Sequence, residues 1–299
     1  MDLSIIVLNW NTAEETLACL ESIYSQSHRH AIEVIVADNA SSDCSRTVVP
    51  ARFPQAKLVV HSTNLGFCAG NNRAVPGTTG RYVLFLNSDT VATEGALDRL
   101  VDFADANVEA AIVGPKLLNQ DGSLQYSCRH FPNLGTGFFR NTPLGRLLPK
   151  NHFTSDYLMS DWDHASVRDV DWVSGAALLI RREALEKLGG FDEAFYMYCE
   201  DVDLCFRAHE AGWRVVYYPD SVIYHIIGRA SNKVPTRMTY MFHRSMYRFY
   251  RKHYAATTPL LIRPLILPGL ALRASGQLAK YRWRNITRRF TNKQGPHGR

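Results

Sequence analysis

An apolar run that ends abruptly in three polar residues occupies positions 82–89, Tyr82-Val83-Leu84-Phe85-Leu86-Asn87-Ser88-Asp89. A short apolar run is typical of a strand that is buried on both faces, as strands are in parallel sheets. A similar pattern occurs at 34–38, where Val-Ile-Val-Ala is followed by Asp38. Both stretches predict buried strands of a helix-covered sheet whose ends carry polar side chains.

Strand and helix patterns alternate through the first half of the chain. Alternation of this kind is typical of an α/β fold with a mostly parallel central sheet. The predicted strands are 4–8, 33–37, 57–60 and 82–86, and the predicted helices are about 13–25, 43–50, 67–76 and 94–106. The stretch 107–170 predicts loops around one or two strands near 111–118. Further strands are expected at 173–180, 214–217 and 222–226, and further helices at 182–188 and about 201–211.

The charge of the chain is divided unevenly. Residues 1–220 hold all 28 acidic residues and 18 of the 34 Lys and Arg, a net charge of −10. Residues 221–299 hold the other 16 Lys and Arg, with a basic, aromatic helix predicted at 236–254 and an amphipathic tail at 259–290. We therefore expect a globular domain over 1–230 and a basic helical extension over 231–299. An acid-free basic end indicates an anionic partner, either nucleic acid or a lipid surface.

The cysteines and the N-terminus bear on the expected compartment. The six cysteines contain no C-x-x-C pair, so neither a disulfide framework nor a thiolate metal site is indicated, and a reducing compartment is expected. Residues 4–8 are interpreted as a first strand rather than a signal peptide. The apolar stretch 260–272 is too short to span a membrane and contains Arg263, Pro264 and Pro268. These features predict a cytoplasmic protein.

Polar residues follow three of the predicted strands, beginning at Asn9, Asp38 and Asn87. Any one of these ends could be a simple turn or helix cap. In open α/β sheets, however, ligands bind beyond the carboxyl ends of the strands, where these three ends would converge. Asp38 is placed to accept hydrogen bonds from a nucleoside. The absence of a Gly-x-Gly-x-x-Gly turn after the first strand argues against a nicotinamide cofactor.

Two residues are candidate ligands of a divalent cation. Asp89 follows the predicted strand 82–86, and His225 lies at the end of the strand predicted at 222–226. No Walker-type lysine loop is present to neutralise a diphosphate, and oxygen ligands with one imidazole suit Mn²⁺ or Mg²⁺ better than zinc. A structural role for a lone histidine at a strand end is the alternative.

Three carboxylates, Glu200, Asp201 and Asp203, follow the aromatic stretch 191–198. Neighbouring like charges and an apolar wall both raise the pKa of a carboxyl group, which suits a general base. The alternative is an acidic helix N-terminus, where Glu200 and Asp201 would favour the helix dipole. That alternative leaves the apolar character of the preceding stretch unexplained.

Taken together, these motifs resemble family 2 glycosyltransferases, and most of all their rhamnosyltransferase-like branch. The resemblance covers about residues 3–230 and rests on the order and spacing of many motifs. They are Asp38-Asn39-Ala40-Ser41-Ser42-Asp43, Asn64-Leu65-Gly66-Phe67, Leu86-Asn87-Ser88-Asp89, Gly175-Ala176-Ala177-Leu178-Leu179-Ile180-Arg181, Gly189-Gly190-Phe191-Asp192-Glu193, Glu200-Asp201-Val202-Asp203-Leu204 and Tyr224-His225. Asn87 stands where the family's Asp-x-Asp motif has its first carboxylate, a change that fits this branch.

The resemblance implies a GT-A fold, a single Rossmann-like domain, with a nucleotide-binding half at 1–106 and an acceptor and catalytic half at 107–230. It also implies a nucleotide-sugar donor, a divalent metal (Mn²⁺ or Mg²⁺) and inversion at the anomeric carbon. Asp201 is expected to be the catalytic base, supported by Glu200 and Asp203, and Asp89 and His225 to hold the metal. The expected nucleotide-binding residues are Asn9, Asp38, Asn64, Gly66 and Asn87, and the expected acceptor wall is Trp172, Tyr196 and Tyr198.

The expected reaction moves rhamnose, or another deoxyhexose, from a dTDP- or UDP-sugar onto a lipid-linked or polysaccharide acceptor in cell-envelope glycan synthesis. Because such acceptors are membrane-bound, the basic extension is expected to hold the protein peripherally on the inner face of the cell membrane, through its anionic surface. Three alternatives remain open at this point. They are a transferase of a different hexose, a nucleotide-sugar-binding protein without turnover, and a nucleic-acid-binding protein with a decayed transferase domain.

Overall fold

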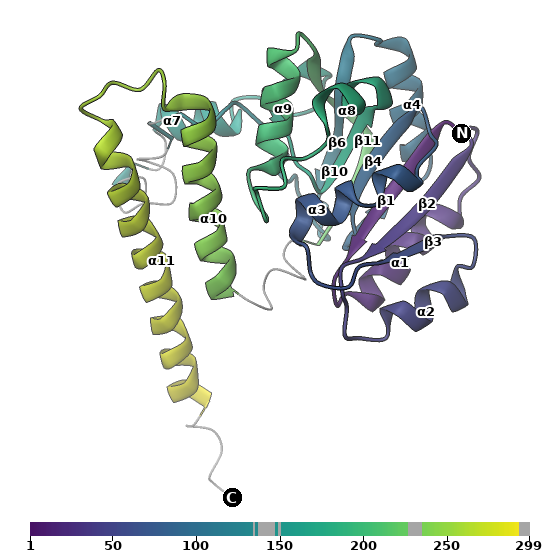
Figure 1. The fold of residues 1–299 in the computed structure, drawn as a ribbon, viewed down its shortest axis with the longest axis horizontal. Coiled ribbons are helices and arrows are strands. Elements are labelled where there is room, and N and C mark those ends of the chain that lie inside the picture. The colour runs from purple at the N-terminus through teal and green to yellow at the C-terminus, as the bar shows by residue number, and fades with distance from the viewer. Residues whose placement is uncertain (134, 137–146, 149–150, 227–234, 293–299) are drawn as a thin grey trace, which may run out of the picture. The chain divides into compact units, whose positions relative to one another are not determined.

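The computed structural model describes residues 1–133, 135–136, 147–148, 151–226 and 235–292 of the chain (Figure 1). The chain divides into two compact units, Met1–Ala230 and Ser231–Arg299. The first unit contains the sheets and the motifs named above. The second consists of helices, and the two units are described separately.

The first unit is built on a large sheet with the strand order β3-β2-β1-β4-β10-β6-β11-β5, and β8 pairs with β11. Its strands are β3 (Lys57–Val60), β2 (Ile32–Asp38), β1 (Leu3–Asn9), β4 (Tyr82–Asn87), β10 (Ala177–Arg181), β6 (Ala110–Leu118), β11 (Arg214–His225), β5 (Thr90–Ala92) and β8 (Arg168–Asp169). The first four run parallel, as do β6 and β11, whereas β10 runs antiparallel to both β4 and β6. The α/β fold class is confirmed, and the sheet is mixed.

A small second sheet lies beside the large one. It pairs β7 (Cys128–Arg129) with β9 (Trp172–Val173) in antiparallel fashion. The sequence predicted one strand over 173–180, but this segment divides into β9 and β10 around Gly175. No helix lies between β9 and β10, and β10 then pairs antiparallel with β4.

Helices cover both faces of the large sheet, which explains why its central strands are mostly apolar. They are α1 (Ala13–Tyr24), α2 (Ser45–Arg52), α3 (Gly66–Asn72), α4 (Ala96–Ala106), α8 (Arg182–Leu188) and α9 (Glu200–Glu210). On one face, alternate strand residues such as Leu84 and Leu86 share a buried cluster with residues of α1, α2 and α4. Phe85 points the opposite way, and its ring lies 4.7 Å from that of Phe191. The expected burial on both faces is confirmed.

Three other elements differ from the sequence expectation. The strands predicted at 214–217 and 222–226 form the single strand β11, with a register shift between Tyr218 and Val222. The helix predicted at 67–76 ends at Asn72, since Pro76 has no N–H to donate to the Asn72 carbonyl, and a 3₁₀ turn follows at Val75–Gly77. Strand β5, only three residues long, was not predicted.

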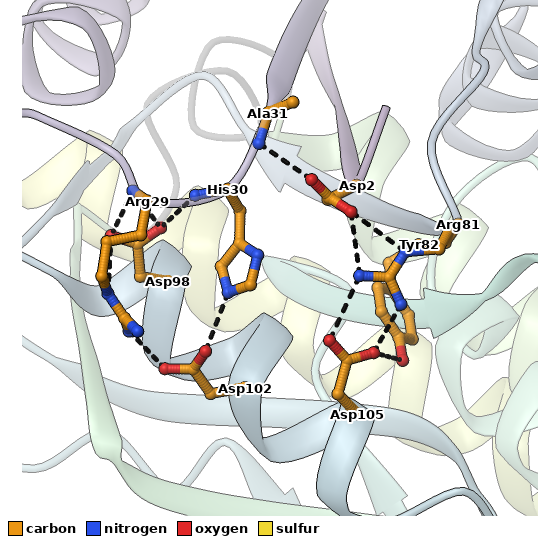
Figure 2. A network of polar contacts seen from close by, with 9 residues as sticks. All are labelled: Asp2, Arg29, His30, Ala31, Arg81, Tyr82, Asp98, Asp102 and Asp105. Carbon is orange, nitrogen blue, oxygen red and sulfur yellow. Dashed lines mark hydrogen bonds and ion pairs between the residues drawn. The ribbon is translucent and has the colours of Figure 1, made fainter.

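A polar network closes the sheet edge at which β1, β2 and β4 begin (Figure 2). The guanidinium of Arg81 joins Asp2 to Asp105, and Asp2 also accepts the backbone N–H of Ala31 at 3.0 Å. In the same network, His30 and Arg29 both contact Asp102. These residues sit where the strands start, so the ion pairs fix the sheet at the edge opposite the strand ends that carry the candidate site.

The six cysteines are all free thiols. Burial raises the pKa of Cys19 and of Cys128 to about 12, and burial also raises the pKa of Cys205. Cys44, next to the start of α2, is exposed. The buried thiols pack as small apolar groups.

The second unit contains α10 (Pro235–Phe249), a π-helical turn (Tyr250–Tyr254) and α11 (Arg263–Asn292). These elements belong to the basic C-terminal part of the chain. Large apolar side chains are exposed in this unit, including Leu261 at 88% and Leu272 at 76%. Among the helices that the structure describes, none is long and apolar enough to cross a membrane. In the tail predicted at 259–290, the side chains beyond Tyr281 lie outside the described residues.

A turn at 64–67 ties distant parts of the first unit together. Its Asn64 accepts hydrogen bonds from Asn39 at 3.1 Å and from the hydroxyl of Tyr196 at 2.9 Å. The backbone N–H of Phe67 donates to the carbonyl of Tyr196 at 2.8 Å. Gly66 adopts φ +82°, and a Cβ there would lie 2.4 Å from that carbonyl oxygen. The turn therefore has room only for glycine at this position.

Substituting Gly66→Ala should destabilise the fold, because alanine at positive φ costs about 1–3 kcal/mol before any clash is counted. Gly77→Ala is the matched control, since no heavy atom lies within 4 Å of its added Cβ. Urea unfolding should show a clear loss for Gly66→Ala and a change within about 0.5 kcal/mol for Gly77→Ala. Equal stability of the two variants would contradict this account of the turn.

Candidate active site

The ends of β1, β2 and β4 meet at one edge of the sheet. Asn9 pairs with Asp38 in the β1–β2 ladder, and Leu8 pairs with Asn87 in the β1–β4 ladder. The residues just beyond two of these ends are strained, since Asn11 and Ala40 have φ of 55° and 63°. Strained backbone of this kind clusters at functional sites. The three polar strand ends named from the sequence are thus brought together.

Asn9 is fully buried, and its side-chain amide contacts protein groups on both sides. Its Nδ2 donates to Oδ2 of Asp38 at 2.8 Å and to Oγ of Ser41 at 3.1 Å. Its Oδ1 accepts the hydroxyl hydrogens of Thr12 at 2.8 Å and Thr16 at 3.0 Å. Asn9 was expected to touch a nucleotide; in the structure its buried side chain holds Asp38.

Asp38 is held as a buried carboxylate at the tip of β2. Besides the bond from Asn9, its Oδ1 accepts from the backbone N–H of Ser41 at 3.0 Å and from Nε of Arg46 at 2.8 Å. Burial raises the pKa of Asp38, but the hydrogen bonds from Ser41, Arg46 and Asn9 outweigh it and leave the pKa below its usual value. The carboxylate is ionised at neutral pH, and the half-exposed Arg46 covers it.

Asp89 and His225, which are 136 positions apart, lie next to each other. Nε2 of His225 is 3.4 Å from Oδ1 of Asp89 and 3.4 Å from Nδ2 of Asn87. The contact follows from the β5–β11 pairing, in which His225 stands opposite Thr90. Asn87 therefore lies beside the candidate metal ligands as well as at the strand end where a nucleotide was expected.

These side chains fit a divalent cation that takes most of its ligands from elsewhere. Within the described residues, no group of three or more His, Cys, Asp and Glu could hold a metal. Asp89 and His225 supply one carboxylate and one imidazole, and Asn87 adds an amide. Mg²⁺ and Mn²⁺ sites of this kind usually complete their coordination with water and substrate phosphates. The donor set suits a cation that is bound together with a diphosphate.

Asp201 lies in the first turn of α9 and is half-buried. Its Oδ2 accepts the backbone N–H of Gly175 at 3.0 Å, and its Oδ1 accepts that of Val202 at 2.9 Å. Burial raises the pKa of Asp201, which the two backbone hydrogen bonds partly offset. Tyr198 and Cys199, immediately before the helix, have φ of 70° and 63°. A strained turn thus delivers a carboxylate of raised basicity.

The other two acids of the cluster have different surroundings. Asp203 is fully buried and pairs with Arg207, whose Nε lies 2.8 Å from its Oδ2. Arg207 also donates to the carbonyl oxygens of Leu188 and Gly190, so this pair fixes the turn after α8. Asp203 was expected to support the base; in the structure its ion pair with Arg207 gives it a structural contact. Glu200 is 6% exposed, and its Oε2 has no hydrogen-bond partner among the described residues.

The three predicted acceptor aromatics are placed differently from one another. Trp172 is 6% exposed and donates from Nε1 to the carbonyl of His130 at 3.0 Å. Tyr196 uses its hydroxyl and its carbonyl to hold the 64–67 turn. These contacts give Trp172 and Tyr196 structural roles. Tyr198, in contrast, lies in the strained turn directly before the acidic cluster at 200–203. An acceptor wall made of all three is not supported by this arrangement.

Two residues that the sequence motifs did not single out lie at this edge. Arg129 places its guanidinium 5.0 Å from the ring centre of Trp172, and its charge lowers the pKa of Asp201. Gln125 contacts His225 through both ends of its amide. Gln125 precedes β7 and Arg129 is part of it. This segment has no clear periodicity in the sequence, so only the structure shows that the two residues lie near the candidate site. The edge therefore combines a candidate base, two candidate cation ligands and a buried carboxylate at a strand tip.

Comparison with known proteins agrees with this geometry. Residues 2–243 match the family model described as "Glycosyltransferase like family 2". N-acetylglucosaminyl-diphospho-decaprenol L-rhamnosyltransferase of Mycobacterium tuberculosis is 31% identical over 277 residues, which cover 89% of this chain and 90% of that protein. Rhamnosyltransferase WbbL of Escherichia coli K12 is 30% identical over 214 residues, covering 68% of this chain and 72% of that protein.

Solved structures show the same fold at lower identity. The mannosyltransferase PcManGT from Pyrobaculum calidifontis, in complex with GDP-Man and Mn²⁺, matches with a TM-score of 0.56 and 19% identity, over 95% of this chain and 80% of that one. TarS 1–349 of S. aureus in complex with UDP matches with a TM-score of 0.54 and 17% identity, over 91% and 81%. At this identity the likeness shows the GT-A fold alone. The family match and the full-length relatives show that the chain belongs to glycosyltransferase family 2.

Proposed function

We propose that this glycosyltransferase moves rhamnose, or another deoxyhexose, from a dTDP- or UDP-sugar onto a lipid-linked acceptor, with inversion at the anomeric carbon. The observation that carries the proposal is the half-buried Asp201, held by two backbone amides at the same sheet edge as Asp89 and His225. The rhamnosyltransferases that match over most of this chain support the sugar and the acceptor. A transferase of a different hexose remains the alternative.

Asp201 acts as the general base in this proposal. Its carboxylate takes the proton from an acceptor hydroxyl, the hydroxyl oxygen forms a bond to the anomeric carbon, and the bond from that carbon to the nucleoside diphosphate breaks. The hydrogen bonds from Gly175 and Val202 hold both oxygens in place. The raised pKa makes the carboxylate a better proton acceptor than an exposed aspartate, which suits this role.

Asp89 and His225 hold the divalent cation, and Asn87 lies beside them. When bound, Mn²⁺ or Mg²⁺ supplies positive charge to the departing diphosphate. Asp38 binds the nucleoside, for which Arg46 must move away from the carboxylate that it now covers. Asn64 and Gly66 shape the neighbouring turn. Glu200, buried next to Asp201, helps to set the pKa of the base through its own charge state.

The second unit provides a surface for a membrane in this proposal. Leu265 and Leu272 are seven residues apart on α11 and so lie on the same face of the helix, where both are exposed. Exposed Leu261 precedes the helix, and Arg251, Lys252 and Lys280 are exposed in the same unit. Apolar side chains with cations beside them suit the interface of an anionic lipid surface.

Replacing Asp201 with Asn should abolish most transfer without unfolding the protein. Loss of the base is expected to lower kcat by about 10²–10⁴-fold, while calorimetry should still detect donor binding. The matched control is Asp203→Asn, two positions away, which should lower the thermal midpoint yet leave kcat per folded molecule within a few-fold. A transfer assay with dTDP-rhamnose and a lipid-diphosphate acceptor measures kcat for the two variants. Turnover by Asp201→Asn close to that of the wild type would remove this residue from the mechanism.

Glu200→Gln should change how stability depends on pH. Burial, and then the charge of Asp201, raise the pKa of Glu200 well above its usual 4.5 in the folded state. Between the unfolded and folded pKa values the native state binds more protons, so the free energy of unfolding falls as pH rises. Relative to the wild type, Glu200→Gln should therefore gain stability on going from about pH 4 to about pH 8. Parallel pH profiles in urea unfolding would contradict the burial of an ionisable Glu200.

Vesicle binding tests the second unit. The chain should sediment with vesicles that contain anionic lipid, and deleting 255–299 should abolish this. Changing Leu261, Leu265 and Leu272 together to Ser should weaken binding, because it removes apolar area from the interface. Val108→Ser is the control, since Val108 is a similarly exposed apolar residue of the first unit. Binding that survives the deletion would show that the extension does not hold the protein on the membrane.

A further inference from the structure

Gln125 is a buried residue in the segment between β6 and β7, and it contacts His225 through both ends of its side-chain amide. Its Nε2 donates to the carbonyl oxygen of His225 at 2.7 Å, and its Oε1 lies 3.0 Å from Nδ1 of the same residue. Nε2 also donates to Oδ1 of Asn119 at 2.8 Å. One side chain thus contacts both the backbone and the imidazole of a residue 100 positions away.

The partners of Gln125 fix which way its amide points. The carbonyl of His225 can only accept a hydrogen bond, so the amide atom that faces it must be the nitrogen. Asn119 presents its oxygen to the same atom, because its own Nδ2 donates to Ser123 at 2.8 Å. The oxygen of Gln125 therefore faces Nδ1 of His225. An oxygen acceptor there requires Nδ1 to carry the hydrogen.

Hydrogen on Nδ1 leaves the other ring nitrogen available to a metal. A metal-binding imidazole is neutral and carries hydrogen on one nitrogen only, so in that form Nε2 of His225 has a lone pair. That lone pair faces the carboxylate of Asp89 at 3.4 Å, with the amide nitrogen of Asn87 at the same distance. Two electron-rich atoms that face each other without a hydrogen between them are stabilised by a cation bound to both. Metal-binding histidines commonly have their second nitrogen held in this way.

We propose that Gln125 is a positioning residue that holds His225 as the Nδ1–H tautomer, so that Nε2 and the Asp89 carboxylate together face a divalent cation. The inference rests on the metal use put forward above for this site. The tautomer, however, can be measured without metal, donor or acceptor. Failure of the proposed function and failure of the Gln125 inference are therefore distinguishable.

The tautomer is tested by nitrogen NMR of ¹⁵N-histidine-labelled protein without metal, with His225→Asn used to assign the signals. The wild type should show protonated Nδ1 and unprotonated Nε2 at His225. Gln125→Met, which keeps the length of the side chain but has no acceptor oxygen, should lose this preference. Gln125→Glu should keep it, since a carboxylate also accepts from Nδ1. A wild-type spectrum with hydrogen on Nε2 would overturn the proposal, whatever the variants do.

Metal affinity gives a second measurement that does not depend on turnover. Mn²⁺ titrations followed by electron paramagnetic resonance should give a Kd about 10–100-fold higher for Gln125→Met than for the wild type. Gln125→Glu should bind Mn²⁺ no more weakly than the wild type. This contrast is decisive because Glu, like Met, cannot donate to the carbonyl of His225. Equal loss of affinity in both variants would mean that Gln125 only anchors the end of β11, and the proposal would be wrong.

Discussion

The hydrogen bond from the backbone amide of Gly175 to the carboxylate of Asp201 connects the segment between β9 and β10 to the helix that carries the candidate base. Gly175 lies where the chain passes from β9 to β10, and its Cα is closely surrounded. An added Cβ would lie 3.3 Å from the ring of Phe67 and 3.5 Å from Cβ of Asp201. Close packing of three separate segments at one glycine thus sets the position of Asp201 relative to the strand ends.

Helix geometry explains why three neighbouring acids have three different environments. Successive residues of an α-helix are about 100° apart around the axis, so Asp201 and Asp203 point to nearly opposite sides. One side faces Gly175, and the other faces the turn that Arg207 holds. Glu200 lies between them and is buried, and its Oε2 has no hydrogen-bond partner within the described residues. The three carboxyl groups that are adjacent in the sequence therefore point in different directions in the fold. Of the three, Asp201 faces the strand ends.

Much of the fold was predictable because each strand of the first half is a short apolar run with polar residues at its end. The convergence of Asn9, Asp38 and Asn87 followed from one rule about parallel strands, and the ladders confirm it. The reversed direction of β10 was not predictable, since residues 173–180 have the same apolar pattern in either direction. The division of that segment at Gly175 depends on a contact with a helix that begins 25 positions later.

Side chains that act on other side chains were hardest to predict. Trp172 and Tyr196 are residue types that often bind sugar rings, which is why an acceptor role was expected. Their polar atoms instead contact residues far away in the sequence, which the sequence does not reveal. Gln125 and Arg129 belong to no periodic pattern, and their roles depend on which residues they meet.

The state of the cysteines has a practical consequence. A thiol reacts with alkylating reagents as its thiolate, and burial that keeps Cys19 and Cys128 protonated also shields them from the reagent. Cys44 is exposed. It directly precedes α2, at the end of the loop that follows β2 and Asp38. The native chain therefore has its own attachment point for a fluorophore or a spin label, beside the strand tip where a nucleoside is proposed to bind, without any engineered cysteine.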